Sequence, residues 1–219
     1  MKPTAQQIKT LQDYLHQTLV YREAYEEIYD HILTALEHQP DNIPFQEAIN
    51  NIIRVDFGDP KNLLKVEKSI KTALVNDAIR KYLGYVKSYF APPGLWFTVV
   101  GALAAYYFFV NAKVSPGVVM LIFGFIAICP SVIWLLRLYN TGYILDTTRK
   151  SAKDKLFETF TGIPVRVLLV PLLFTSITNY TLWQVNNNYL ITLFFVIGVI
   201  YNLSLYKLYK EEFKTASAK

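Results

Sequence analysis

The sequence is poor in the residues from which most reactive sites are built. Its 219 residues include a single cysteine, Cys129, which excludes an intrachain disulfide framework and a metal site made of several cysteines. This cysteine lies in an apolar run, where the residue is typically a small buried hydrophobic group. Only three histidines are present, and HExxH, Gly-x-Ser-x-Gly and glycine-rich phosphate-loop motifs are all missing. We therefore expect no enzyme activity, no cofactor and no bound metal.

Charge is also scarce, and the deficit is concentrated in long stretches. Charged residues make up 18% of the chain, against about 25% in an average soluble protein. Asp, Glu, Lys and Arg are absent from residues 88–112, 114–136 and 167–206. An apolar run of 18 or more uncharged residues is long enough to cross the hydrocarbon core of a bilayer, which is roughly 30 Å thick. The sequence therefore predicts a multi-pass membrane protein.

Turn-forming residues divide these stretches into about four predicted transmembrane helices, which together occupy residues 91–206. The last two form a helical hairpin, and the four are expected near 95–112, 118–136, 167–183 and 189–206. An inner loop at 137–166 joins the second helix to the third, and a cytosolic tail at 207–219 follows the fourth. With helical periodicity in the remaining segments as well, the predicted fold class is all-α.

Lys and Arg are distributed unevenly around the predicted spans. Residues 61–90 carry seven, the inner loop carries six and the tail carries four, whereas the two outer turns carry only Lys113. Because Lys and Arg accumulate on the cytoplasmic side of membrane helices, both termini are predicted to be cytoplasmic. The amino terminus shows no apolar signal sequence, so the segment before the spans is expected to stay in the cytosol.

The predicted spans themselves contain polar residues but no charged ones. This argues against active transport, because ion-coupled carriers generally keep charged groups inside the membrane. We interpret the polar residues as interhelical hydrogen-bonding groups, with a pore lined by hydroxyls and amides as the alternative. They are Thr175, Ser176, Thr178, Asn179 and Thr181 in the third span, and Asn202 and Ser204 in the fourth. Gly124, with Ser131 or Ala127, is expected to let two helices approach closely.

An acidic helical head at residues 1–60 precedes a stalk helix at 61–90, which is expected to complete the head. The head holds four basic and ten acidic residues, so it would repel nucleic acid, and no direct nucleic-acid binding is expected. Such short helices make a marginal core on their own. We therefore expect the head to lean on the stalk helix, on a second copy of the chain or on a partner.

Residues typical of helix ends punctuate the head. Phe45 and Ala48 are placed on the inward side of its third predicted helix. Phe57 and Gly58 end that helix, with the glycine suited to the left-handed conformation that follows a helix. Asp59 and Pro60 then begin the stalk helix, since a carboxylate caps free N–H groups and proline at the first helical position loses no hydrogen bond. The punctuation residues of interest are therefore Phe45, Ala48, Phe57, Gly58, Asp59 and Pro60.

Three segments of the head resemble the N-terminal HAAS-type domain of bacterial membrane proteins. They are Glu27-Ile28-Tyr29-Asp30-His31-Ile32, Phe45-Gln46-Glu47-Ala48 and Phe57-Gly58-Asp59-Pro60-Lys61-Asn62-Leu63. The similarity covers roughly residues 11–74, with one departure where Phe57 stands in place of a more usual leucine. It implies a short helical head before a variable set of spans and a location in the bacterial cytoplasmic (inner) membrane. It also implies pairing with a PadR-like winged-helix transcription regulator.

One candidate binding surface is the acidic face of the second predicted helix, which we define as Glu23, Glu27, Asp30 and His31. A face rich in carboxylates suits a basic protein and steers its approach. Glu27 and His31 are four residues apart and resemble half of a metal site, but no second cluster supplies the other ligands. The pair is therefore expected to be a surface contact or to touch a partner.

A second candidate surface is basic and lies in the inner loop. It comprises Arg149, Lys150, Lys153 and Lys155, and is followed by the apolar residues Leu156, Phe157 and Phe160. This pattern is typical of a short surface helix that lies on anionic lipid headgroups. A solvated loop that only sets the topology is the alternative.

Together these features favour a membrane-anchored regulatory or interaction protein whose cytosolic head binds a protein partner. The alternative is a subunit of a small channel or transporter, with the head as a gating or homo-oligomerisation element. An integral membrane enzyme acting on lipids is disfavoured by the missing catalytic residues.

Overall fold

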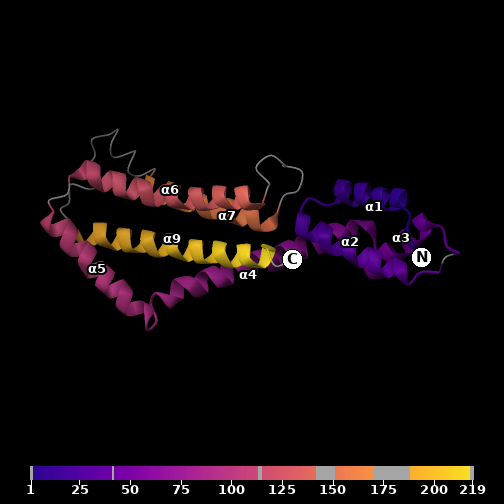
Figure 1. Cartoon of the computed structure of the whole chain (residues 1–219), viewed down its shortest axis with the longest axis horizontal. Helices are drawn as coiled ribbons and strands as arrows, with labels where there is room; N and C mark the ends of the chain where they lie inside the picture. The colour runs from indigo at the N-terminus through magenta and orange to yellow at the C-terminus, as the bar shows by residue number, and fades with distance from the viewer. Residues whose placement is uncertain (1, 41, 113–114, 142–150, 170–187, 218–219) are drawn as a thin grey trace. The chain divides into compact units, whose positions relative to one another are not determined.

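The computed structural model describes residues 2–40, 42–112, 115–141, 151–169 and 188–217 (Figure 1). These residues form helices and contain no β-strand, which confirms the all-α prediction for this part of the chain. The elements, in chain order, are α1 Ala5–Thr18, α2 Arg22–Glu37, α3 Phe45–Asp56, α4 Pro60–Ser88, α5 Gly94–Asn111, α6 Pro116–Thr141, α7 Ala152–Pro164, the π-helix η1 Val165–Leu169 and α9 Asn188–Ser217.

The chain divides into two compact units, which we name by their content. The head unit comprises Met1–Asp77 and Leu145–Lys155, and the span unit comprises Ala78–Ile144 and Leu156–Lys219. Helices α4 and α7 each begin in the head unit and continue in the span unit. The two units are described separately below.

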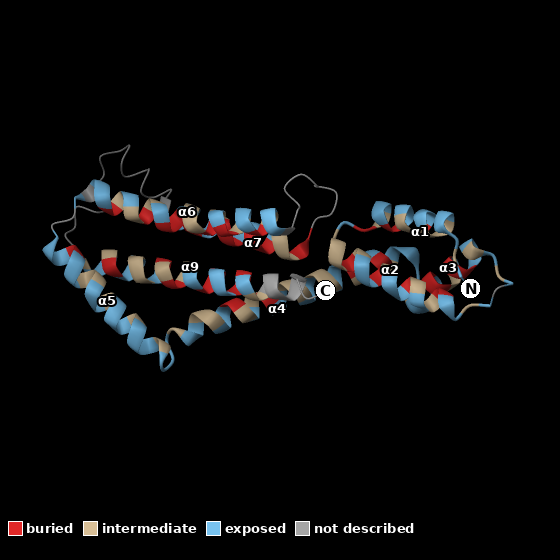
Figure 2. Ribbon diagram, in the orientation of Figure 1, coloured by how far each residue is buried: buried red, intermediate tan, exposed pale blue. Residues whose placement is uncertain are grey.

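The head unit has its own aliphatic core, formed by one face of each of its helices (Figure 2). Ile28, Ile32 and Leu36 are buried at helical spacing on α2, and Leu11 and Leu15 meet them from α1. The core also includes Ala48, Ile49, Ile52 and Ile53 of α3, and Leu63 of α4. Because Leu63 is completely buried here, the first turns of the stalk helix belong to the hydrophobic core of the head.

A buried carboxylate joins α4 to the turn between α1 and α2. Glu67 Oε1 accepts hydrogen bonds from the backbone N–H groups of Val20 at 2.7 Å and Tyr21 at 2.8 Å. Glu67 is buried, and the two N–H groups that it accepts from belong to the residues directly before the first turn of α2. The Lys71 ammonium lies 4.6 Å from the centre of the Tyr21 ring and closes the same junction.

The predicted helix-end residues lie in α3 and in the turn from α3 to the first residue of α4. Ala48 is fully buried, and Phe45 and Phe57 pack partly buried against the core. Gly58 has φ = 81°, in the left-handed region that side chains disfavour, and a Cβ there would lie 3.0 Å from Asn62 Nδ2. Helix α4 then begins at Pro60, directly after Asp59. Local chemistry at these residues therefore sets the turn that directs the stalk helix away from α3.

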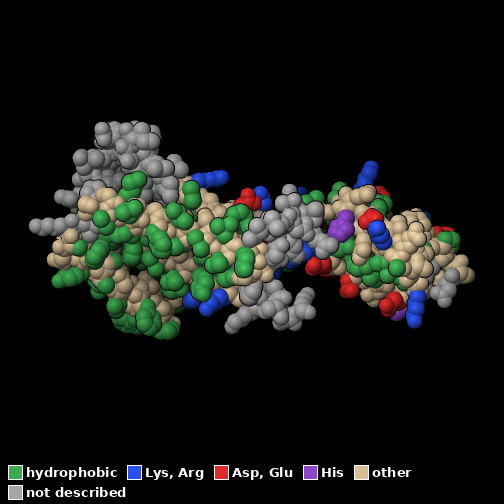
Figure 3. All heavy atoms as spheres, turned by 45° about the horizontal axis from the view of Figure 1, so that its top comes forward, with side chains coloured by type: hydrophobic (Ala, Val, Ile, Leu, Met, Phe, Trp, Pro, Cys, Tyr) green, Lys and Arg blue, Asp and Glu red, His purple; other side chains and the backbone are tan. Residues whose placement is uncertain are grey.

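Three helices of the span unit are long and apolar enough to cross a membrane: Gly94–Asn111, Gly117–Asn140 and Asn188–Glu211. They coincide with the first, second and fourth predicted spans, and three helices that could cross a membrane are consistent with the predicted multi-pass membrane protein. The predicted third span, near 167–183, lies almost entirely outside the described residues. Figure 3 shows hydrophobic side chains spread over the visible face of the span unit, as contact with lipid requires.

Helix α9 packs against both α5 and α6. The rings of Tyr106 and Tyr189 stack with centroids 4.8 Å apart near the start of α9. At Gly198 a Cβ would lie only 2.7 Å from Ile126 Cγ2, so glycine is required for the close approach of α9 and α6. Gly124, where the sequence predicted such an approach, has no atom of the described residues within 4 Å of a Cβ, so the helices that the structure describes make no close approach there.

Candidate functional site

Two of the predicted acidic-face residues are available for a partner. Glu27 and Asp30 are exposed on α2, and neither makes a hydrogen bond or an ion pair within the described part of the chain. The opposite side of the helix carries Ile28, Ile32 and Leu36, which are buried in the core. Packing on one side therefore fixes the direction in which the two carboxylates project on the other.

His31 pairs with a different carboxylate from the one its spacing suggested. Its Nε2 lies 2.9 Å from Asp56 Oδ2, at the end of α3, and its ring meets that of Phe57 edge-on at 5.4 Å. The expected surface pair with Glu27 is therefore wrong, because α3 brings a closer acceptor than the helix itself. Within the described residues no group of three or more His, Cys, Asp and Glu side chains is arranged to hold a metal ion.

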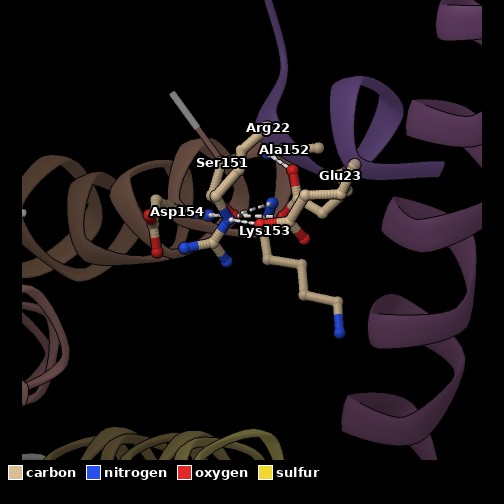
Figure 4. A network of polar contacts seen from close by, with 7 residues as sticks. Arg22, Glu23, Ser151, Ala152, Lys153 and Asp154 are labelled. Atoms are coloured by element: carbon tan, nitrogen blue, oxygen red, sulfur yellow. Dashed lines mark hydrogen bonds and ion pairs between the residues drawn. The ribbon is translucent and has the colours of Figure 1, made fainter. Parts of the chain in front are cut away.

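Glu23 is engaged within the protein, at the start of α7 (Figure 4). Its Oε1 accepts a hydrogen bond from the Ser151 hydroxyl, and its Oε2 accepts one from the Ala152 backbone N–H at 3.0 Å. Ser151 Oγ in turn accepts from the N–H groups of Lys153 at 3.2 Å and Asp154 at 3.4 Å. A carboxylate and a hydroxyl thus cap successive N–H groups at the positive end of the α7 dipole.

This capping corrects the assignment of Glu23 to a partner-binding surface. Ser151 and Ala152 are almost completely buried, so the contact belongs to the interior of the head unit. The pattern Ser151-x-x-Asp154 is a known signature of a helix start and would have located the first turn of α7. What the sequence does not contain is the pairing of this turn with Glu23, which lies 128 residues away from Ser151.

The basic surface of the inner loop is described only in part. Arg149 and Lys150 lie outside the described residues, whereas Lys153 is half-buried and Lys155 is exposed in the first turns of α7. A helix does form here, but Leu156, Phe157 and Phe160 are buried in protein. The prediction that this apolar side lies on the lipid surface is therefore wrong.

Contacts with three other helices explain the burial of α7. The Arg137 guanidinium of α6 lies 4.8 Å from the centre of the Phe157 ring, and the Tyr82 ring of α4 meets the Phe160 ring at a tilt of 34° with the centroids 4.8 Å apart. The Tyr201 hydroxyl of α9 donates a 2.6 Å hydrogen bond to the Phe160 carbonyl. Helix α7 is therefore held inside the span unit by side chains that sequence periodicity could not pair with it.

The π-helix that continues α7 lies at the level of the candidate spans. Val167 and Ile126 line one cavity together with residues 194–202 of α9. Ile126 is near the middle of the span Gly117–Asn140, and the α9 residues are near the middle of Asn188–Glu211. Val167 of η1 therefore lies beside the middle of two candidate spans, and Arg166 directly precedes it in the chain.

The polar residues of the fourth span take part in packing. The Asn202 amide donates to the Ile126 carbonyl at 3.0 Å, which ties α9 to α6, and to the Gly198 carbonyl of its own helix at 3.0 Å. Ser204 is completely buried. The candidates of the third span, Thr175, Ser176, Thr178, Asn179 and Thr181, lie outside the described residues. For Asn202, hydrogen bonding between helices is the role that the geometry supports.

Comparisons of the chain with protein-family models, with curated proteins and with solved structures find no match. The HAAS-type resemblance and its implied partner therefore rest on the three head segments alone. The function of the chain is accordingly argued from the surfaces described above.

Proposed function

We propose that the chain is a membrane-anchored regulatory protein whose cytosolic helical head binds a protein partner with a basic surface. The HAAS-type resemblance implies a PadR-like winged-helix regulator as that partner. The Lys and Arg distribution supports a multi-pass protein of the bacterial inner membrane with both termini in the cytoplasm. Exposed Lys155, next to Lys153, adds a contact for anionic lipid headgroups on the same side.

The observation that carries this proposal is that two carboxylates on α2 make no hydrogen bond or ion pair with the residues that the structure describes. Glu27 and Asp30 are exposed, adjacent on one side of a helix whose other side is fixed in the core. Two carboxylates presented rigidly attract a basic surface over distance and are not already neutralised by a described neighbour. A winged-helix regulator is basic where it binds DNA, so its charge complements this face.

The test uses the full-length chain in detergent and a purified PadR-like regulator from the same organism. Glu27→Lys with Asp30→Lys is expected to abolish retention of the regulator, because attraction is replaced by repulsion. Retention by the natural chain should also weaken as the salt concentration is raised from about 50 to about 500 mM, because salt screens the attraction between exposed charges.

The matched control reverses two exposed acidic residues elsewhere on the head, as Asp13→Lys with Glu47→Lys. This variant carries the same change of net charge and should retain the regulator like the natural chain. Equal retention by both double variants would show that the acidic face of α2 is not the binding surface.

A channel or transporter subunit is the second candidate, and the place of Arg166 in the chain, directly before Val167, is the observation that favours it. A charged residue next to the middle of candidate spans is typical of a transport pathway. On a Cys129→Ala background, Val167→Cys should then react with a membrane-impermeant thiol reagent, because a pathway brings water to that depth. Leu121→Cys, at a highly exposed apolar position of α6, is the lipid-facing control and should stay unreactive.

A further inference from the structure

Two helices of the span unit contain a proline that interrupts the α-helical hydrogen-bond pattern. Pro130 lies inside α6, and Pro164 is the last residue of α7 before the π-helix η1. Proline has no backbone N–H, so the carbonyl group four residues earlier loses its α-helical donor. The carbonyl groups affected are those of Ile126 in α6 and Phe160 in α7. All four residues are buried, which makes an unpaired carbonyl group costly at either place.

Consecutive side chains of α9 supply the two missing donors. The Asn202 amide donates to the Ile126 carbonyl at 3.0 Å, and the Tyr201 hydroxyl donates to the Phe160 carbonyl at 2.6 Å. Membrane helices tolerate proline where a neighbouring helix satisfies the carbonyl group that the proline frees. Here one helix does so for two neighbours at adjacent positions. Both proline breaks therefore depend on the position of the same two-residue segment of α9.

The packing around these contacts leaves room for them to open. A cavity of about 130 Å³ lies beside them, and Pro164, Tyr201 and Asn202 are among the residues that line it. Asn202 Oδ1 is buried without a hydrogen-bond partner in the part of the chain that the structure describes, so the closed arrangement carries an energetic cost. After Pro164 the chain also changes from an α-helix to a π-helix, an irregularity that is frequent at functional sites. These features favour a joint that can open.

We propose that Tyr201 and Asn202 form a latch that couples two hinges, one at Pro130 in α6 and one at Pro164 between α7 and η1. While the latch is closed, both freed carbonyl groups are paired and both helices are held at their proline breaks. A displacement of α9 breaks the two hydrogen bonds together, so the hinges are released as one event. Every residue of this device belongs to the span unit, so it does not depend on partner binding by the head.

The chain carries a natural reporter for the first hinge, because its only cysteine, Cys129, directly precedes Pro130. The experiment measures the rate at which N-ethylmaleimide modifies Cys129 in the full-length chain in detergent. Asn202→Leu should raise this rate about 3- to 20-fold, the range that hydrogen bonds between membrane helices support. Pro130→Ala supplies a backbone N–H to the Ile126 carbonyl, so adding Asn202→Leu to it should change the rate less than about twofold. Equal increases on the two backgrounds would overturn the role of Asn202 at this hinge.

Tyr201→Phe tests the coupling itself, because it removes only the donor at the second hinge. It should nevertheless raise the rate at Cys129, and Pro164→Ala should reverse the increase by restoring a backbone N–H for the Phe160 carbonyl. Thr192→Val is the matched control, since Thr192 is a buried α9 residue whose hydroxyl donates within its own helix, and it should leave the rate unchanged. An unchanged rate in Tyr201→Phe, or an equal increase in Thr192→Val, would overturn the coupled latch. A general loss of fold would raise the rate in a way that the proline replacements do not reverse, and would count against it too.

Discussion

Large apolar side chains are buried inside the head unit, whereas many of them are exposed on the outside of the span unit. In the head, Ile28, Ile32 and Leu36 are at most 1% exposed, and polar residues cover the outside. In the span unit, Phe97 and Phe125 are 77% and 72% exposed on α5 and α6. The head is therefore held together by the transfer of apolar surface out of water, a driving force that is missing between helices surrounded by lipid.

The span unit relies instead on close packing and on hydrogen bonds between helices. Gly198 lets α9 approach α6, and Asn202 donates a hydrogen bond across that contact to the Ile126 carbonyl. In the head a comparable joint is made by Glu67, a carboxylate that accepts two backbone N–H groups. An amide side chain therefore joins helices in the span unit, and a carboxyl side chain makes the comparable joint in the head.

The largest expected effect comes from truncation of the head core. Ile32→Ala should lower the free energy of unfolding of the head by about 2–5 kcal/mol, because it removes buried apolar surface and leaves a cavity. Hydrogen exchange of the α2 amides in the full-length chain measures this change. Phe125→Ala, a larger truncation on the outside of α6, should change stability by no more than about 0.5 kcal/mol, since lipid replaces the lost contacts. Similar losses for both variants would contradict the comparison of the two units.

The next effect concerns helix packing in the span unit. Gly198→Val should destabilise the span unit by about 1–3 kcal/mol, because its Cβ would overlap the Ile126 side chain. A lower thermal midpoint in detergent, followed by tryptophan fluorescence, reports the loss. Gly124→Val is the control, since a Cβ there meets no atom of the described residues within 4 Å. Ile126→Ala combined with Gly198→Val should recover part of the midpoint, and no recovery would show that this contact is not the cause.

The smallest effect separates a structural carboxylate from a binding one. Glu23→Ala should cost about 0.5–2 kcal/mol, because α7 loses the acceptor for Ala152 N–H and for the Ser151 hydroxyl. Faster hydrogen exchange at residues 151–157 would reveal the uncapped helix. Glu27→Ala, one turn further along α2, should leave that exchange unchanged while weakening partner binding. Exchange that is equally fast in both variants would place the two carboxylates in one common role.

Local chemistry was sufficient to predict much of the fold. The uncharged runs identified α5, α6 and α9 to within a few residues, because length and apolarity alone decide whether a helix fits a bilayer. The buried stripe Ile28, Ile32 and Leu36 follows from helical periodicity. Gly58 and Pro60 each have conformational preferences that are encoded in a single residue, so the turn between α3 and α4 could be read from them.

The candidate sites depended on contacts between residues far apart in the chain. Periodicity placed Glu23 on the acidic face, but only tertiary structure brought Ser151 to it and removed it from a partner's reach. The same holds for His31, which meets Asp56 rather than its neighbour on the helix. The sequence indicated that a helix at α7 would have an apolar side, and Leu156, Phe157 and Phe160 are buried there. A sequence does not say, however, whether lipid or protein covers such a side.

By itself the sequence determined what each segment is: which runs are long enough to cross a membrane, which helices have an apolar side, and where the helices of the head begin and end. These properties depend on neighbours within a few residues, so they are encoded locally. Only the tertiary structure decided what each polar or charged group does, with Glu23 capping α7, Glu67 joining α4 to the start of α2 and Asn202 joining α9 to α6. Such roles depend on distances between atoms that folding alone brings together.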